Sequence, residues 1–169
     1  GRFDHRPMRD ILDDVRIKTA GGAREITLVG QTVNAYKEPA TGADFADLLE
    51  EVCAIESVER VAFISSHPKD LNEKLARVCA TLPKMNPRFH LALQSGSNPM
   101  LRRMNRKYTI EHFLERIAEF KAYNPSWAIT TDLIVGFPGE TEDDFQQTVE
   151  VCKTGIFAQA YMFVYSPRR

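Results

Sequence analysis

The pattern of apolar and polar positions changes its period repeatedly along the chain. Short apolar and β-branched runs are typical of buried strands, and they occur at 25–29, 60–65, 88–93, 129–135 and 157–164. Between them, apolar side chains recur every three or four residues, as on one face of a helix. This spacing predicts helices from Pro7 to Gly21-Gly22 and over 45–55, 70–82, 99–104, 109–120 and 141–154.

Three of these helices have a residue that is suited to cap the first turn. Asp70 is followed by Glu73 in the spacing of a capping box, and Thr109 and Thr141 each stand directly before an apolar helical pattern. We therefore expect Asp70, Thr109 and Thr141 to be N-caps.

Strands that are separated by helices indicate parallel pairing through right-handed crossovers, so the fold class is α/β. Both an α/β barrel and an open doubly wound sheet fit this order of elements. Five parallel strands are fewer than the eight of a full barrel, so either the sheet is open or strands lie outside this sequence. No repeat or linker divides the 169 residues, which predicts one domain.

The composition excludes several classes of protein. A net charge of −1 argues against a globally basic nucleic-acid binder, so contact with RNA would need a local patch or another domain. The apolar runs are too short for a transmembrane helix, and the polar start of the chain is no signal peptide. The chain does not begin with methionine, which we take as a hint of a fragment.

The three cysteines, Cys53, Cys79 and Cys152, are odd in number and far apart, and no CxxC or CxxxCxxC pattern occurs. Each lies among apolar neighbours in a helical pattern. We expect small buried thiols in a reducing compartment rather than disulfides or metal ligands. The four histidines show no metal-binding spacing either.

Candidate functional residues gather where the predicted strands end, which is where parallel α/β proteins bind ligands. Asp132 stands inside an apolar strand, and a buried acid is costly unless a polar group meets it. Gln94 and Gln31 follow two other strands, and turns do not require glutamine. His90 is either a hydrogen-bonded core histidine or a residue that faces a barrel lumen. Adjacent Ser66 and His67 do not form a hydrolytic pair, because neighbouring side chains on a strand end point apart.

A basic run, Arg102, Arg103, Arg106 and Lys107, follows the third strand. Such a run is usually a solvated helix end, and charge pattern favours that interpretation for Arg102 and Arg103. Arg106 can also be interpreted as a ligand for a carboxylate or a phosphate.

Five segments in order resemble one enzyme family. They read GQTVNAY at 30–36, SSHP at 65–68, HLALQSGSNPMLRRMNRKYT at 90–109, TTDLIVGFPGETEDDF at 130–145 and AYMFVYSPR at 160–168. The chain resembles the radical S-adenosylmethionine methylthiotransferases, and the first two segments resemble the tRNA-modifying MiaB type within them.

The resemblance implies a partial parallel (β/α)6 radical SAM barrel, TIM-like, with five of its six strands present. It implies S-adenosylmethionine and 4Fe-4S clusters as cofactors, an electron-donor protein, tRNA as partner, no membrane and a cytoplasmic location. The reaction implied adds a methylthio group to C2 of N6-isopentenyladenosine in tRNA: one cluster cleaves S-adenosylmethionine to a radical and a second supplies sulfur.

The resemblance also implies roles for residues that match its motifs. Gln94 and Asp132 would hold the ribose, and Arg106, twelve residues after Gln94, the methionine carboxylate. The remaining predicted cofactor-binding positions are Gly30 and Gln31 at the methionine amino group, Val135 and Gly136 at adenine, and Ser66, where relatives use an acid.

The family's CxxxCxxC loop is expected just upstream of residue 1. Residues 1–169 are accordingly expected to be a radical SAM barrel fragment without the first strand, the cluster loop, the amino-terminal methylthiotransferase domain or the carboxy-terminal TRAM domain. We expect this fragment to be inactive alone, with no catalytic or metal-binding residue of its own. The alternatives are a sister enzyme that acts on threonylcarbamoyladenosine in tRNA or on ribosomal protein S12, and a non-catalytic fragment that contacts protein or RNA.

Overall fold

The computed structural model describes residues 4–64 and 71–167. Helices and strands alternate as the sequence predicts. In chain order they are α1 (Met8–Ala20), β1 (Glu25–Leu28), the 3-10 helix η1 (Val33–Ala35), α2 (Phe45–Ala54), β2 (Arg60–Phe63), α3 (Glu73–Thr81), β3 (Arg88–His90), α4 (Asn98–Arg103), α5 (Ile110–Tyr123), β4 (Ala128–Val135), α6 (Glu142–Lys153) and β5 (Gln159–Val164).

Every pair of neighbouring strands is parallel. β1 pairs with β2, and β4 lies between β3 and β5. The two groups meet before β3 begins, where the Val61 N–H donates to Lys84 O and the Asn86 N–H donates to Val61 O, each at 2.8 Å. The strand order along the described residues is therefore 1-2-3-4-5, without closure, which confirms a partial parallel barrel.

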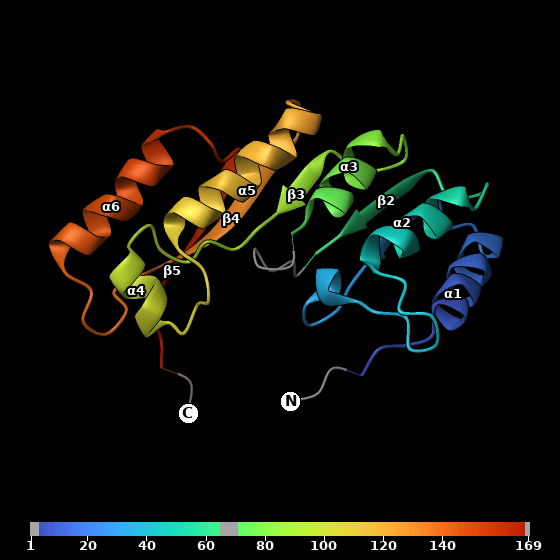
Figure 1. The fold of residues 1–169 in the computed structure, drawn as a ribbon, viewed down its shortest axis with the longest axis horizontal. Helices are drawn as coiled ribbons and strands as arrows, with labels where there is room; N and C mark the ends of the chain where they lie inside the picture. The colour runs from blue at the N-terminus through green and yellow to red at the C-terminus, as the bar shows by residue number, and fades with distance from the viewer. Residues whose placement is uncertain (1–3, 65–70, 168–169) are drawn as a thin grey trace.

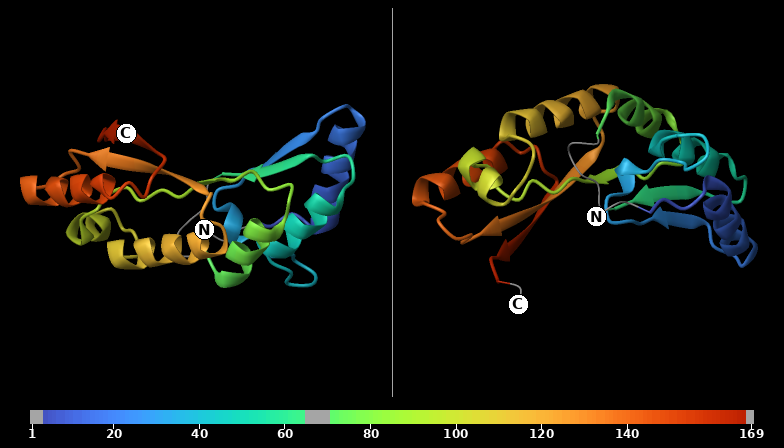
Figure 2. Two further views of the ribbon diagram at one scale, coloured as in Figure 1. Left: turned by 90° about the horizontal axis from the view of Figure 1, so that it is seen from above. Right: turned by 60° about the horizontal axis from the view of Figure 1, so that its bottom comes forward.

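The helices form an arc along one side of the strands, and the opposite side carries no helix within 4–64 and 71–167 (Figures 1 and 2). Strand residues that face the helices are buried, among them Ile26, Val61, Phe89 and Ile129. The alternate residues face the side without helices, which we call the open face. Because side chains alternate along a strand, His90, Thr130, Asp132 and Tyr161 share the open face.

Aromatic rings fill the centre of the helix-covered side. Phe89 stacks on Phe120 with ring centroids 4.7 Å apart, and Trp127 meets Phe120 edge to face at 4.8 Å. Phe63 joins from β2 at 5.4 Å from Phe89. This cluster ties both groups of strands to α5 and explains why the strands hold together where the ladder is interrupted.

Two of the three predicted caps are confirmed. Thr109 Oγ1 accepts from His112 N, and Thr141 forms a reciprocal capping box with Asp144. For α3 the prediction was wrong: the N-cap is Asn72, whose Oδ1 accepts from Leu75 N at 2.9 Å. Asp70 lies outside the described residues, and Asn72 stands at the right distance from the first turn of a helix that begins at Glu73.

The third strand is shorter than predicted because its ladder is interrupted. His90 pairs with Thr130 and Gln94 bridges to Leu133, so four residues advance on β3 while three advance on β4. The extra residue is a β-bulge, which lets a strand change the direction of its side chains. Gln94 at its end has φ +75°, a left-handed conformation that is uncommon outside glycine.

The last strand has one partner and one free edge among the described residues. Met162, Phe163 and Val164 are all exposed, Val164 to 80%. Within the part of the chain that the structure describes, this end of β5 is therefore an apolar strand edge open to solvent.

Cysteine burial matches the prediction in two positions of three. Cys53 and Cys79 are buried, and Cys152 is exposed. The prediction was wrong for Cys152 because α6 buries the neighbouring turn of Asp144 and Thr148 instead. Among the helices of the described residues, none is both long and apolar enough to traverse a bilayer.

Candidate functional site

Gln94 has the least ordinary environment of the predicted site residues. It is only 7% exposed, its backbone is left-handed, and its side-chain amide has no hydrogen-bond partner within the described residues. A polar side chain on a largely buried residue is normally paired, and strained backbone collects at ligand sites. Both features indicate a position shaped for something other than packing.

The bulge places Gln94 beside Asp132, as the sequence predicts for strands that share an edge. The Gln94 N–H donates to Asp132 O at 2.8 Å, and the Ile134 N–H donates to Gln94 O at 2.9 Å. The backbone of Gln94 thus pairs directly with β4, the strand that carries Asp132.

His90 is the polar partner of Asp132, the acid that the sequence places in an apolar strand. His90 Nε2 lies 3.2 Å from Asp132 Oδ2, and His90 Nδ1 lies 3.0 Å from Thr130 Oγ1. His90 is therefore hydrogen-bonded and on the open face, so both sequence-based interpretations are partly right. Asp132 Oδ1 has no partner within the described residues, and the side chain is 31% exposed.

Arg106 lies in the connection from α4 to α5. Its guanidinium makes no hydrogen bond or ion pair to any part of the chain that the structure describes. Tyr108, two residues on, donates from its hydroxyl to Ala92 O and Leu93 O, each at 3.0 Å. Burial raises the pKa of Tyr108 to about 12, and the nearby Arg106 cation opposes that rise. The loop that carries Arg106 is thus fastened to the strand end that carries Gln94.

The turn after Gln94 serves packing. Ser95 and Ser97 are fully buried; the Ser97 hydroxyl donates to Asp144, and Ser95 Oγ lies 3.3 Å from Thr148 Oγ1. A Cβ on Gly96 would lie 2.7 Å from Thr148 Cα, so only glycine lets α6 approach this closely. The polar residues of this turn dock α6, and Gln94 alone remains available for a ligand.

The turn after β4 keeps its backbone groups occupied. Val135 O accepts from Tyr165 N at 2.8 Å, and the Gly136 N–H donates to Glu140 Oε2 at 2.5 Å. Gly136 has φ +73°, and a Cβ there would meet nothing within 4 Å. The Gly136 N–H is therefore not available to a ligand, but the turn leaves open space beside Gly136 in which a planar ring could lie.

Arg103 lies against the same turn, so it is not simply a solvated helix end as charge pattern suggests. Its Nη1 donates to Pro138 O at 3.3 Å, and a Cβ on Gly139 would lie 1.7 Å from that nitrogen. Arg103 therefore braces the glycine turn that follows Asp132 and Gly136.

Gly30 and Gln31 line a cavity of about 840 Å³ beside β1. Its walls come from α1, β1, η1 and the start of α2, and Gln94, Arg106 and Asp132 are not among them. The predicted residues thus occupy two neighbourhoods, one at each side of the strand series. Ser66 lies outside the described residues.

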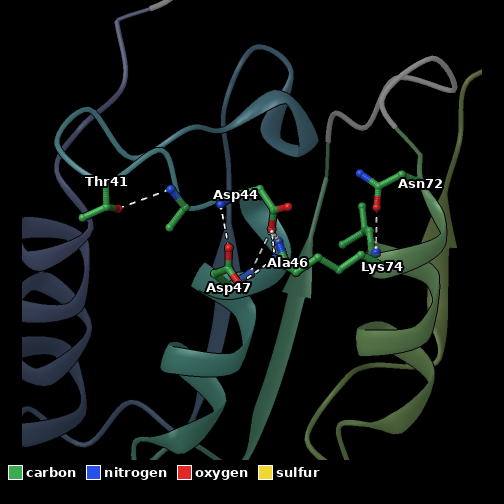
Figure 3. Close-up of polar contacts among 8 residues, drawn as sticks. Thr41, Asp44, Ala46, Asp47, Asn72 and Lys74 are labelled. Carbon is green, nitrogen blue, oxygen red and sulfur yellow. Dashed lines mark hydrogen bonds and ion pairs between the residues drawn. The ribbon is translucent and has the colours of Figure 1, made fainter.

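A polar cluster at the starts of α2 and α3 gave no signal in the sequence beyond the spacing of two aspartates. Lys74 Nζ donates to Asp44 Oδ1 at 3.0 Å and to Asp47 Oδ1 at 2.6 Å (Figure 3). The Lys74 hydrogen bond lowers the pKa of Asp47, and the same bond raises the pKa of Lys74. Because these charges satisfy one another, the cluster joins the starts of two helices.

The described residues contain no group of three side chains that could hold a metal ion. The three thiols lie on different helices, two of them buried. An iron–sulfur cluster, which needs convergent thiolates, does not fit the cysteines of this chain.

Comparison with known proteins gives one family. The family model described as "Radical SAM superfamily" matches residues 1–152. The tRNA-2-methylthio-N(6)-dimethylallyladenosine synthase of Desulfitobacterium hafniense is 47% identical over 99% of this chain and 38% of its own length. The synthase of the same name from Caldicellulosiruptor saccharolyticus is 46% identical over the whole chain and 36% of its own length. The resemblance drawn from the motifs is confirmed.

The chain therefore spans little more than a third of the length of these curated relatives. Among solved structures, the cobalamin-dependent S-adenosylmethionine radical enzyme OxsB with aqua-cobalamin bound superimposes with a TM-score of 0.69. That match covers 92% of this chain and 23% of OxsB at 15% identity, so it bears on the fold alone.

Proposed function

Because the chain belongs to the radical SAM superfamily, we propose that it is the cofactor-binding core of a tRNA methylthiotransferase. The enzyme adds a methylthio group to C2 of N6-isopentenyladenosine in tRNA. The observation that carries this proposal is the near-complete alignment with synthases of that name at 46–47% identity.

S-adenosylmethionine is the cofactor of the proposed site, and when bound it supplies the carbon radical and the methyl group of this chemistry. Three unpaired groups suit its polar parts. The Gln94 amide and Asp132 Oδ1 can form hydrogen bonds with ribose hydroxyls, and the Arg106 guanidinium can hold the methionine carboxylate.

The remaining assignments use backbone and space. Gly30 and Gln31 meet the methionine amino group, and the open space beside Gly136, next to Val135, accepts the adenine ring. Ser66 belongs to the same proposal from its sequence position alone. The two neighbourhoods would be bridged by a ligand that reaches from β1 to β4.

Binding tests this proposal directly. Isothermal titration calorimetry with S-adenosylhomocysteine is expected to give saturable binding to the chain. Asp132→Asn and Arg106→Ala should each weaken it by roughly tenfold to a hundredfold, because each removes a charge-assisted hydrogen bond. Arg102→Ala, an exposed neighbour of the same sign, should leave the affinity unchanged. Equal effects of all three substitutions would argue against the assigned roles.

The 4Fe-4S clusters belong to parts of the enzyme outside these 169 residues. In this proposal the complete enzyme adds the first barrel strand with its cluster loop, an amino-terminal methylthiotransferase domain and a carboxy-terminal TRAM domain. We expect no 5′-deoxyadenosine from the chain alone after iron–sulfur reconstitution; clear product would contradict that division.

The complete enzyme would meet tRNA and an electron-donor protein in the cytoplasm. Its substrate is tested by methylthiolation assays with tRNA that carries isopentenyladenosine, tRNA that carries threonylcarbamoyladenosine, and ribosomal protein S12. Turnover of the first alone is expected, and turnover of either other substrate would assign the enzyme to a sister branch.

A further inference from the structure

Three hydrogen-bonded side chains lie on the open face: His90, Thr130 and Asp132. Only Asp132 has a role in the proposed cofactor site. Thr130 and Asp132 lie two residues apart on β4, and His90 reaches both from β3. The His90 side chain is 24% exposed and Asp132 is 31% exposed, so the pair lies at the surface of the open face. Thr130 is buried.

Hydrogen-bond chemistry decides which atom donates in each of these two contacts. An ionised carboxylate only accepts, so the proton between His90 and Asp132 is on His90 Nε2 in the neutral and in the charged imidazole. In the neutral ring, Nδ1 then accepts from the Thr130 hydroxyl. Asp132 thus selects the tautomer in which His90 donates to it, and the Thr130 hydroxyl, which can donate or accept, fits that tautomer.

The contact leaves Asp132 with one oxygen held and one oxygen free. Oδ2 is the atom that faces His90 Nε2 at 3.2 Å, whereas Oδ1 has no partner within the described residues. Tyr161 lies opposite Asp132 in the β4–β5 register, with its ring 6.2 Å from the His90 ring. His90 and Tyr161 therefore flank the carboxylate from the two neighbouring strands.

We propose that His90 is a positioning residue that holds Asp132 Oδ1 toward the ribose hydroxyls of an adenosyl ligand. This inference rests on the proposed S-adenosylmethionine site. Without His90, the Asp132 carboxylate turns among several rotamers, and binding must order it at the moment of contact. This loss of binding free energy affects a ligand whose ribose hydroxyls contact Oδ1. It does not affect a ligand without those hydroxyls.

A purely structural role for His90 gives a different result. If His90 only satisfies Thr130 and Asp132, its loss lowers stability and weakens every ligand alike. A positioning role changes the preference between a ligand with ribose hydroxyls and one without them. That preference is the quantity to measure.

The test uses calorimetric titration of the chain with S-adenosylhomocysteine and with its 2′,3′-dideoxy analogue. We expect the native chain to prefer the diol, and His90→Phe to lower that preference roughly tenfold with little change for the dideoxy ligand. His90→Gln keeps an N–H donor near the position of Nε2 and should restore much of the preference. His112→Phe, a substitution of a half-exposed histidine on α5, is the matched control.

A second measurement examines the contact without any ligand. Nitrogen–proton correlation spectra of the imidazole should show the neutral His90 ring with its proton on Nε2, and Asp132→Ala should mix the tautomers, because it removes the group that only accepts. A proton on Nδ1 overturns the inference.

The titration outcomes separate the inference from the function on which it rests. If the native chain prefers the diol and His90→Phe keeps that preference, the inference is wrong and the proposed site stands. If the native chain binds neither ligand, the proposed function fails for this chain and the inference fails with it.

Discussion

The two faces of the strand series use polar residues in opposite ways. On the helix-covered face, Ser95, Ser97, Asp144 and Thr148 are buried, and each has a partner in the dock between the third-strand turn and α6. Asp132 on the open face, Gln94 at the end of the third strand and Arg106 in the connection from α4 to α5 each keep a polar group without a partner among the described residues. Satisfied polar groups stabilise a fold, whereas unpaired ones are kept for a ligand.

The contrast between the faces gives an ordered set of substitutions. Those on the helix-covered face should change the free energy of unfolding, and those on the open face should change ligand affinity. The following four expectations run from the largest change in stability to the smallest.

Phe89→Ala should lower the free energy of unfolding by about 3–5 kcal/mol, because it empties the centre of the aromatic cluster. Tyr161→Ala on the open face, where the ring is 41% exposed, should cost about 1 kcal/mol or less. Urea denaturation of both variants checks this pair. Similar losses in the free energy of unfolding would mean that side chains on the open face stabilise the fold as much as the core does.

Gly96→Ala should cost about 1–3 kcal/mol, because the new Cβ would lie 2.7 Å from backbone atoms of α6 and the helix must shift. Gly30→Ala is the matched control, since its Cβ would come no closer than 3.7 Å to Val33. The same denaturation experiment separates them. A tolerated Gly96→Ala would contradict the close dock of α6.

Asp144→Asn should remove part of the acid sensitivity of the fold. The Ser97 hydroxyl and then the Thr141 amide lower the pKa of Asp144, so the folded state releases this proton more readily than the unfolded chain. Its contribution is full above the ordinary aspartate pKa of about 3.9 and is lost as pH falls through the lower folded value. Urea midpoints between about pH 5 and pH 2 should fall less steeply in Asp144→Asn.

Arg106→Ala should change the free energy of unfolding by less than about 0.5 kcal/mol, because its guanidinium has no partner to lose within the described residues. The affinity for S-adenosylhomocysteine should fall in the same variant. Thermal unfolding and calorimetry on one sample compare the two quantities. A large loss of stability would place Arg106 with the residues that hold the fold together.

The sequence predicted helix caps correctly where all the capping contacts are local. Thr109 and Thr141 cap helices through bonds to residues three positions away, so a sequence window contains all the partners. Asp70 and Asn72 show the limit, because both satisfy the rule and only the exact helix start distinguishes them.

Pairing between distant strands was out of reach of the sequence pattern. His90 and Asp132 meet only because β3 and β4 pair in one particular register, 42 residues apart. The bulge that brings Gln94 to Leu133 depends on the same register. The acid and the amide could be singled out from the sequence, but their environment could not.

The exposed edge of β5 has a consequence for how the chain behaves at high concentration. Its outer backbone groups have no strand partner among the described residues, and Met162, Phe163 and Val164 offer apolar surface along it. Such an edge is a template on which another strand can add, and repeated addition produces aggregates. The six residues of β5 are therefore a place where copies of this chain can add to one another, on a different element from the aromatic cluster of the core.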